Sequence, residues 1–121
     1  MNKSRSHYAE PLDAVLCAIG ECRAKPASDP QRIIILMAPG DGGKAALPRA
    51  PVVVMDAALF GPQELETLTR LVNRTRAVPV LRVSEEAWRA WARRWPRQTA
   101  QIRRRTHLIV RLDQPSTQEI I

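Results

Sequence analysis

Residues 78–112 read VPVLRVSEEAWRAWARRWPRQTAQIRRRTHLIVRL. Val78–Val83 is a mostly apolar run of the length that is typical of a β-strand. Ser84 is a favourable N-cap residue, and the two glutamates that follow it belong in the first turn of a helix. Thr106–Leu112 is again apolar and of strand length. This order predicts a strand–helix–strand crossover between two parallel strands.

The helical part of this stretch contains a proline. A helix that begins after Ser84 is expected to run to about Trp95. Pro96 then either kinks this helix or opens a second one over Arg97–Arg105, because proline is tolerated in the first turn of a helix but not in its interior.

The same alternation extends upstream. Pro62 predicts the start of a helix that buries one stripe of apolar residues: Leu65, Leu68, Leu71 and Val72. Pro51–Ala57 and Arg32–Ala38 are continuous apolar runs, which favours strands covered on both faces. A first helix is expected from Pro11 to about Lys25, with an apolar face of Leu12, Val15, Leu16 and Ile19.

These elements predict an α/β fold. We expect a small, mostly parallel, four-stranded sheet with helices on its faces, of Rossmann-like or degenerate receiver-like type. A length of 121 residues suits a single domain over residues 1–121, with a flexible basic tail at 1–7 and a second tail at 114–121.

Composition excludes several classes of protein. Apolar residues are 45% of the chain and charged residues 26%, as in a globular domain. No apolar run is long enough to cross a bilayer, and no signal-peptide core follows the polar N-terminus, so we expect a cytoplasmic protein without membrane insertion. Cys17 and Cys22 lie five residues apart in a predicted helix, which favours two free thiols over a disulfide or a zinc site.

Charge is unevenly distributed along the chain. The net charge is +7, but the window from Arg70 to Arg111 holds twelve arginines against two glutamates, and the remainder is mildly acidic. Arginine is a planar, bidentate donor suited to phosphates and carboxylates. Such a cluster is typical of a surface that contacts nucleic acid or an acidic partner, although a plain solvated basic face would also produce it. The candidate polyanion-binding residues are Arg89, Arg93, Arg94, Arg97, Arg103, Arg104 and Arg105.

Three tryptophans share one face of the predicted helix after Ser84. Trp88, Trp91 and Trp95 have the spacing i, i+3 and i+7. They either pack against the sheet or form a protein–protein interface, since tryptophan and arginine are enriched in interface hot spots. Stacking on single-stranded bases is a third option, which requires this face to be exposed.

No complete catalytic, metal or cofactor constellation occurs in the sequence. Pro39–Lys44 is glycine-rich and follows a predicted strand, but it lacks the first glycine and the hydroxyl of a phosphate-binding loop, so we interpret it as a surface turn. His107 has no neighbouring residues that would complete a triad, and we expect it to be structural.

One segment has a local resemblance to a known family. Val52–Asp56, an amphipathic helix and Val78–Ser84 resemble the middle of bacterial receiver domains. The resemblance implies a phosphoacceptor role for Asp56 and a switch-hydroxyl role for Ser84. The family's paired acids and its lysine are missing, since Met37-Ala38-Pro39 and Leu112-Asp113-Gln114 stand in their places. The resemblance therefore implies a non-catalytic relative in which Asp56 and Ser84 form a vestigial site.

Taken together, these patterns favour a non-enzymatic accessory or regulatory binding module of bacterial type. Its Arg-rich C-terminal helical region would contact nucleic acid or an acidic partner. The alternative is a degenerate receiver-like or nucleotide-fold scaffold that acts through protein–protein contacts of the helix carrying Trp88, Trp91 and Trp95. An enzyme centred on Asp56 is the third hypothesis, and the oligomeric state stays open, with a homo-oligomer allowed.

Overall fold

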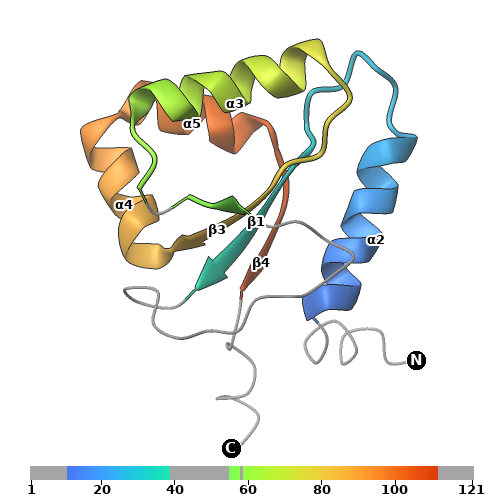
Figure 1. Cartoon of the computed structure of the whole chain (residues 1–121), viewed down its shortest axis with the longest axis horizontal. Coiled ribbons are helices and arrows are strands. Elements are labelled where there is room, and N and C mark those ends of the chain that lie inside the picture. Colours follow the sequence, from blue (N-terminus) through green and yellow to red (C-terminus); the bar gives the residue numbers. More distant parts are fainter. Residues whose placement is uncertain (1–10, 39–54, 58, 112–121) are drawn as a thin grey trace, which may run out of the picture.

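The computed structural model describes residues 11–38, 55–57 and 59–111. The described elements form three layers, with a sheet between one helix and a group of three helices (Figure 1). In chain order they are α2 (Pro11–Ala24), β1 (Ile33–Ala38), β2 (Met55–Asp56), α3 (Pro62–Arg74), β3 (Val80–Ser84), α4 (Glu85–Arg94), α5 (Pro96–Arg104) and β4 (Thr106–Arg111).

The sheet is parallel throughout its described part. Its order is β2-β3-β1-β4, so that β1 lies in the middle, between β3 and β4. Strands β1, β3 and β4 have five or six residues each, and the two residues of β2 pair with the outer side of β3. The predicted α/β class and parallel sheet are confirmed. Most of the predicted strand Pro51–Ala57 and the whole turn Pro39–Lys44 lie outside the described residues.

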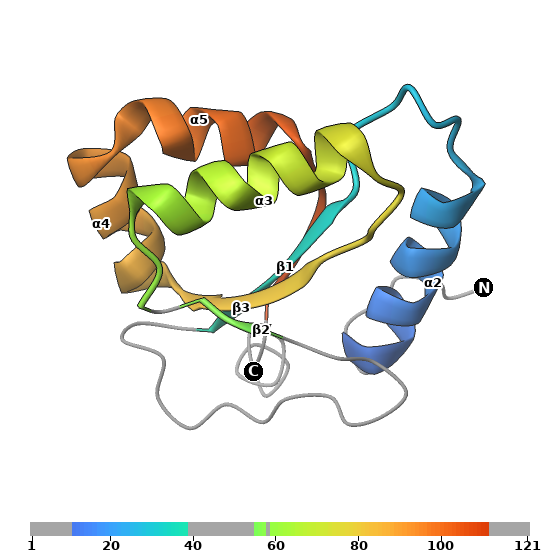
Figure 2. The same ribbon diagram turned by 45° about the horizontal axis from the view of Figure 1, so that its top comes forward.

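One face of the sheet is covered by α3, α4 and α5 (Figure 2). Its core joins alternate residues of β1 to buried residues of all three helices, which are Leu65, Leu68 and Val72 of α3, Trp91 of α4 and Ile102 of α5. All six residues of β1 are buried, as the continuous apolar run predicts for a central strand.

The opposite face is covered by α2. Val15, Ala18 and Cys22 of this helix pack on Ile34 and Leu36. The predicted apolar face of the helix was wrong at Leu16, which is 38% exposed. The small residues Ala18 and Cys22 are buried against the sheet, and Leu16 lies on a part of the helix surface that is open to solvent.

Two other details differ from the sequence prediction or decide between its alternatives. Leu71 was expected in the buried stripe of α3 but is 37% exposed. The helix that begins after Ser84 ends before Trp95, and Pro96 begins α5 as a separate helix.

None of the helices in the described part of the chain is long and apolar enough to span a membrane.

Candidate nucleic-acid interface

The seven predicted polyanion-binding arginines lie on two consecutive helices. Arg89, Arg93 and Arg94 are on α4, Arg97, Arg103 and Arg104 are on α5, and Arg105 is the C-cap of α5. All are exposed except Arg105, which is partly buried. Basic residues in the last turn of each helix also complement the helix dipole.

None of these seven guanidinium groups is paired with a carboxylate of the described residues. The ion pairs within that part of the chain are Lys25–Asp29, His107–Glu21 and Arg111–Glu85. An exposed guanidinium without an internal counter-ion keeps its full charge available to an external anion. The basic helices are therefore not neutralised by the protein's own described acids.

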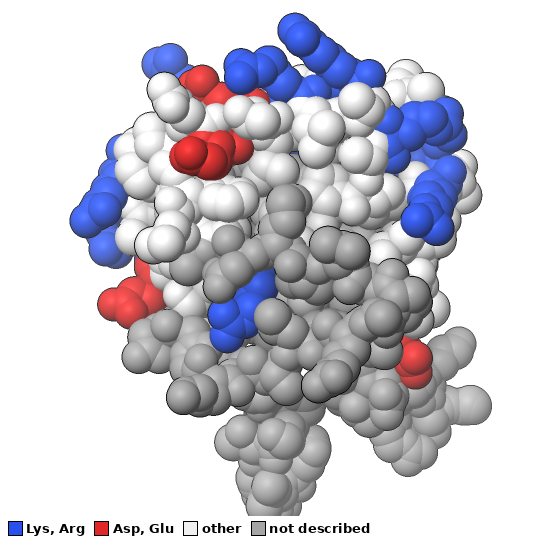
Figure 3. Space-filling view, viewed as in Figure 1, with Lys and Arg blue, Asp and Glu red and all other residues white. Residues whose placement is uncertain are grey.

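The arginines do not form one continuous row. Arg97 and Arg105 line a groove between α3 and α5, Arg94 lines a second groove beside α4, and Arg103 lies over the ring of Trp88. Figure 3 shows basic side chains along the edge formed by α3 and α5 and at other parts of the rim, with acidic side chains between them. The basic surface is thus divided into several sectors.

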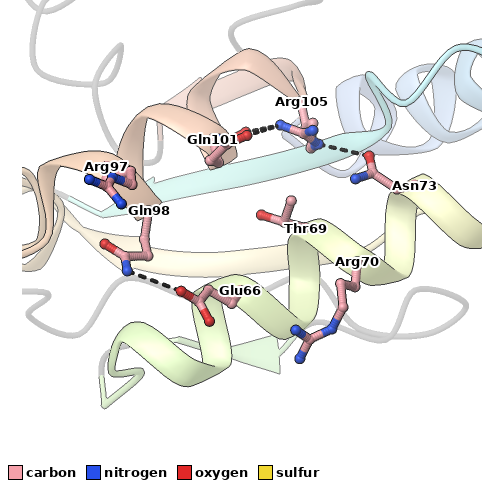
Figure 4. Close-up of a pocket in the computed structure, with 8 residues that line it drawn as sticks. All are labelled: Glu66, Thr69, Arg70, Asn73, Arg97, Gln98, Gln101 and Arg105. Carbon is pink, nitrogen blue, oxygen red and sulfur yellow. Dashed lines mark hydrogen bonds between the residues drawn. The ribbon is translucent and has the colours of Figure 1, made fainter.

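The groove between α3 and α5, hereafter the α3–α5 groove, is lined by polar and charged residues and has a volume of about 360 Å³. It is lined by Glu66, Thr69, Arg70, Asn73, Arg97, Gln98, Gln101 and Arg105 (Figure 4). Two hydrogen bonds cross it. Gln98 Nε2 donates to Glu66 Oε2 at 3.1 Å, and Arg105 Nε donates to Asn73 Oδ1 at 2.9 Å. These bonds lie seven residues apart on both helices, so they hold α3 and α5 in parallel register.

Arg105 is the most constrained arginine of the groove. Besides its bond to Asn73, its Nη1 donates to the backbone oxygen of Gln101 at 3.0 Å and to Gln101 Oε1 at 2.7 Å. Arg70 and Arg97 make no hydrogen bond or ion pair with the rest of the described chain. The groove therefore combines one fixed guanidinium with two free ones.

Of the eight residues that line this groove, the sequence analysis named only Arg97 and Arg105 as site candidates. It did not name Gln98 and Gln101 of α5, nor the four lining residues of α3, which are Glu66, Thr69, Arg70 and Asn73. A signal was present, because Gln98, Gln101 and Arg105 have the spacing i, i+3 and i+7 that places them on one face of a helix. On α3, Glu66, Thr69 and Asn73 have the same spacing, and this polar face of α3 is the one that lies opposite them.

The three tryptophans differ in burial. Trp91 is 2% exposed and belongs to the core, where its ring stacks on Phe60 at a centroid distance of 6.4 Å. Trp88 and Trp95 are partly buried against the same core. Trp91 and Trp95 also line the second groove, of about 270 Å³, next to the 95% exposed Leu59.

The structure describes the side chain of Ser84 but only the strand pairing of Asp56. Ser84 is the last residue of β3 and the N-cap of α4, as predicted, and its Oγ accepts a hydrogen bond from the backbone N–H of Ala87 at 3.0 Å. Asp56 pairs with Arg82 in the register of β2 and β3. Its side chain lies outside the described part of the molecule.

His107 joins β4 to α2. Its Nε2 lies 2.7 Å from Glu21 Oε1, and its Nδ1 lies 3.1 Å from Lys25 Nζ. A lysine ammonium can only donate, so Nδ1 accepts and Nε2–H points to the carboxylate. These contacts agree with the structural role expected for His107.

Cys17 is exposed and Cys22 is buried, and both are free thiols, as predicted.

Comparison with known proteins identifies no relative. No family model, no curated protein and no solved structure matches this chain. Within residues 11–38, 55–57 and 59–111, no group of three or more His, Cys, Asp or Glu side chains could hold a metal ion.

Proposed function

We propose that this protein is a non-enzymatic accessory or regulatory module that binds nucleic acid through the arginines of α4 and α5. The observation that carries the proposal is the absence of carboxylate partners for Arg89, Arg93, Arg94, Arg97, Arg103, Arg104 and Arg105 among the described residues. Phosphate contacts by such groups provide most of the affinity in non-specific nucleic-acid binding.

The division of the basic surface into sectors favours nucleic acid over an acidic protein patch. A flexible polyanion can follow a surface from α5 to α4, whereas a rigid acidic patch matches one sector at a time. Because the sectors are exposed and carry few aromatic groups free for stacking, we expect binding with little sequence preference.

The test is an anisotropy titration of a fluorescently labelled oligonucleotide at low and at high salt. We expect measurable binding at low salt and a steep loss of affinity as salt rises. Absence of binding at low salt rejects the proposal. Affinity purification with and without nuclease distinguishes a nucleic acid from a protein that is retained directly.

A second candidate function is a scaffold that acts through protein contacts near the tryptophan helix. It is supported by Leu59, a large apolar side chain that is 95% exposed at the groove formed with Phe60, Trp91 and Trp95. Exposed apolar groups beside aromatic ones are frequent in protein interfaces. Loss of one stoichiometric partner in Leu59→Ser, with unchanged stability, would favour this candidate.

This second candidate retains the Rossmann-like or degenerate receiver-like fold type as a proposal, with a strand order that departs from that of receiver domains. In receiver domains the strands that correspond to β1, β2, β3 and β4 would be neighbours in that order. Here β1 lies between β3 and β4. The receiver resemblance is therefore carried by the segment 51–84 alone.

A further inference from the structure

Arg105 fixes the orientation of two amide side chains in the α3–α5 groove. Its guanidinium donates to Asn73 Oδ1 and to Gln101 Oε1. Because a guanidinium has donors only, each amide must turn its oxygen toward Arg105. The NH₂ groups of Asn73 and Gln101 make no hydrogen bond with other described residues, so they are the free ends of these amides.

The other end of the groove has the opposite character. Gln98 donates its Nε2 to Glu66, which leaves the Gln98 oxygen and the carboxylate as acceptors. The two ends are seven residues apart on each helix, which corresponds to about 10 Å along the axis. The groove is therefore polarised, with acceptors at the Glu66 end and donors at the Arg105 end.

The three arginines that line the groove are spread along it, with Arg105 at the donor end, Arg70 between the two ends and Arg97 beside Gln98 at the acceptor end (Figure 4). Arg105 is held at the donor end by three hydrogen bonds. Arg70 is exposed one turn before Asn73 on α3, and its side chain points away from Arg105 (Figure 4). Glu66, the acid that lines the groove, belongs to the opposite end. A ligand at the donor end thus meets donors and positive charge.

We propose that the donor end of the α3–α5 groove, formed by Asn73, Gln101 and Arg105, is a phosphate-binding site. A phosphate offers acceptors and negative charge only, whereas the edge of a base presents donors as well as acceptors. The inference rests on the proposed function in that a phosphodiester of nucleic acid is the expected source. A free polyphosphate has the same chemistry.

Two substitutions remove the donor character and still leave Arg105 an acceptor oxygen at each position. In Asn73→Asp and Gln101→Glu an oxygen still faces the guanidinium, but the free NH₂ becomes a carboxylate oxygen. Gln63→Glu is the matched control, because it makes the same chemical change in the exposed first turn of α3, outside the groove. Gln63 is about 15 Å from Asn73 along the helix, which exceeds the screening length at about 0.1 M salt.

The probes are a labelled single-stranded oligonucleotide, a peptide nucleic acid of the same sequence, which lacks phosphates, and inorganic tripolyphosphate. We expect Asn73→Asp and Gln101→Glu each to weaken oligonucleotide binding about ten-fold or more, as for the loss of a hydrogen bond to a charged group, and Gln63→Glu to have little effect. Tripolyphosphate should compete with the oligonucleotide and shift the side-chain NH₂ signals of Asn73 and Gln101 in NMR spectra. The peptide nucleic acid should not bind.

The outcomes separate this inference from the proposed function. If the oligonucleotide binds and the three variants behave alike, or if the peptide nucleic acid binds equally well, the phosphate site is wrong and nucleic-acid binding stands. If only tripolyphosphate binds and shifts the two NH₂ signals, the site stands and nucleic acid is not its partner. Binding of neither phosphate probe overturns both.

Discussion

The guanidinium carbon of Arg103 lies 5.6 Å from the centroid of the Trp88 ring. Arg103 is on α5 and Trp88 is on α4, so this cation–π contact joins the two basic helices. The Trp88 ring in turn lies 5.7 Å from that of Trp91 in the core. Arg103 therefore has a structural contact that its neighbour Arg104 lacks among the described residues.

Arg103→Gln should reduce stability, and Arg104→Gln should not. An exposed cation–π contact contributes about 0.5–1 kcal/mol, whereas a substitution at an exposed residue without contacts changes the free energy of unfolding by less than about 0.5 kcal/mol. Urea unfolding of the two variants provides the measurement. Equal stabilities would show that the Arg103–Trp88 contact contributes nothing.

Trp91→Ala should destabilise the protein severely. Trp91 is 2% exposed and packs against Phe60 and Trp88, and removal of such a ring costs about 3–5 kcal/mol. Leu59→Ser, at a side chain that is 95% exposed, should leave the free energy of unfolding almost unchanged. Circular dichroism during urea unfolding measures both, and a Trp91→Ala variant as stable as the parent would contradict the packing described here.

Ser84→Ala should cost about 1 kcal/mol, because the backbone N–H of Ala87 would lose its acceptor at the start of α4. Ser84→Thr retains the hydroxyl and should recover most of this stability. The comparison of the two thermal unfolding curves tests the capping role. A neutral effect of Ser84→Ala would mean that the hydroxyl contributes no cap.

Burial raises the pKa of the Cys22 thiol above its ordinary value of 9.0, against the opposing fields of Lys25 and Arg32. The unfolded chain therefore loses this proton at lower pH than the folded protein. The contribution to stability is present below pH 9.0 and falls as the pH rises through that value toward the folded pKa. Cys22→Ala should show a shallower loss of stability over this range.

Iodoacetamide labelling tests the difference in burial between Cys17 and Cys22. Cys17 is exposed and should react in the folded protein, whereas Cys22 should be protected until the protein unfolds. Equal labelling of the two thiols under native conditions would contradict the packing of α2 on the sheet.

Local sequence patterns were sufficient for the α/β class and for several elements. The N-cap at Ser84 and the buried run of β1 are each determined by neighbouring residues, and the structure agrees with both, whereas the sequence left open whether Pro96 kinks a helix or begins a new one. The face of α2 was not predictable in this way. Apolar periodicity favours the larger Leu16, whereas the packing of the helix on the sheet buries the smaller Ala18 and Cys22.

The α3–α5 groove shows the same limit at the candidate site. The sequence alone identified Arg97 and Arg105 as candidates, because they belong to a segment that is dense in arginine. Asn73 and Glu66 are 32 residues earlier than the side chains that they contact, Arg105 and Gln98. Only the parallel packing of α3 on α5, which depends on the order of the strands, brings them together.

The salt dependence of nucleic-acid affinity is the most direct test of the basic surface. We would measure the slope of log affinity against log salt for the parent, for a double variant with Arg97→Gln and Arg104→Gln, and for Arg23→Gln as a control on α2. Each lost phosphate contact should reduce the slope by about one, so the double variant should bind more weakly with a shallower slope, and the control should match the parent. Identical slopes in all three proteins, or no binding at low salt, would contradict the account.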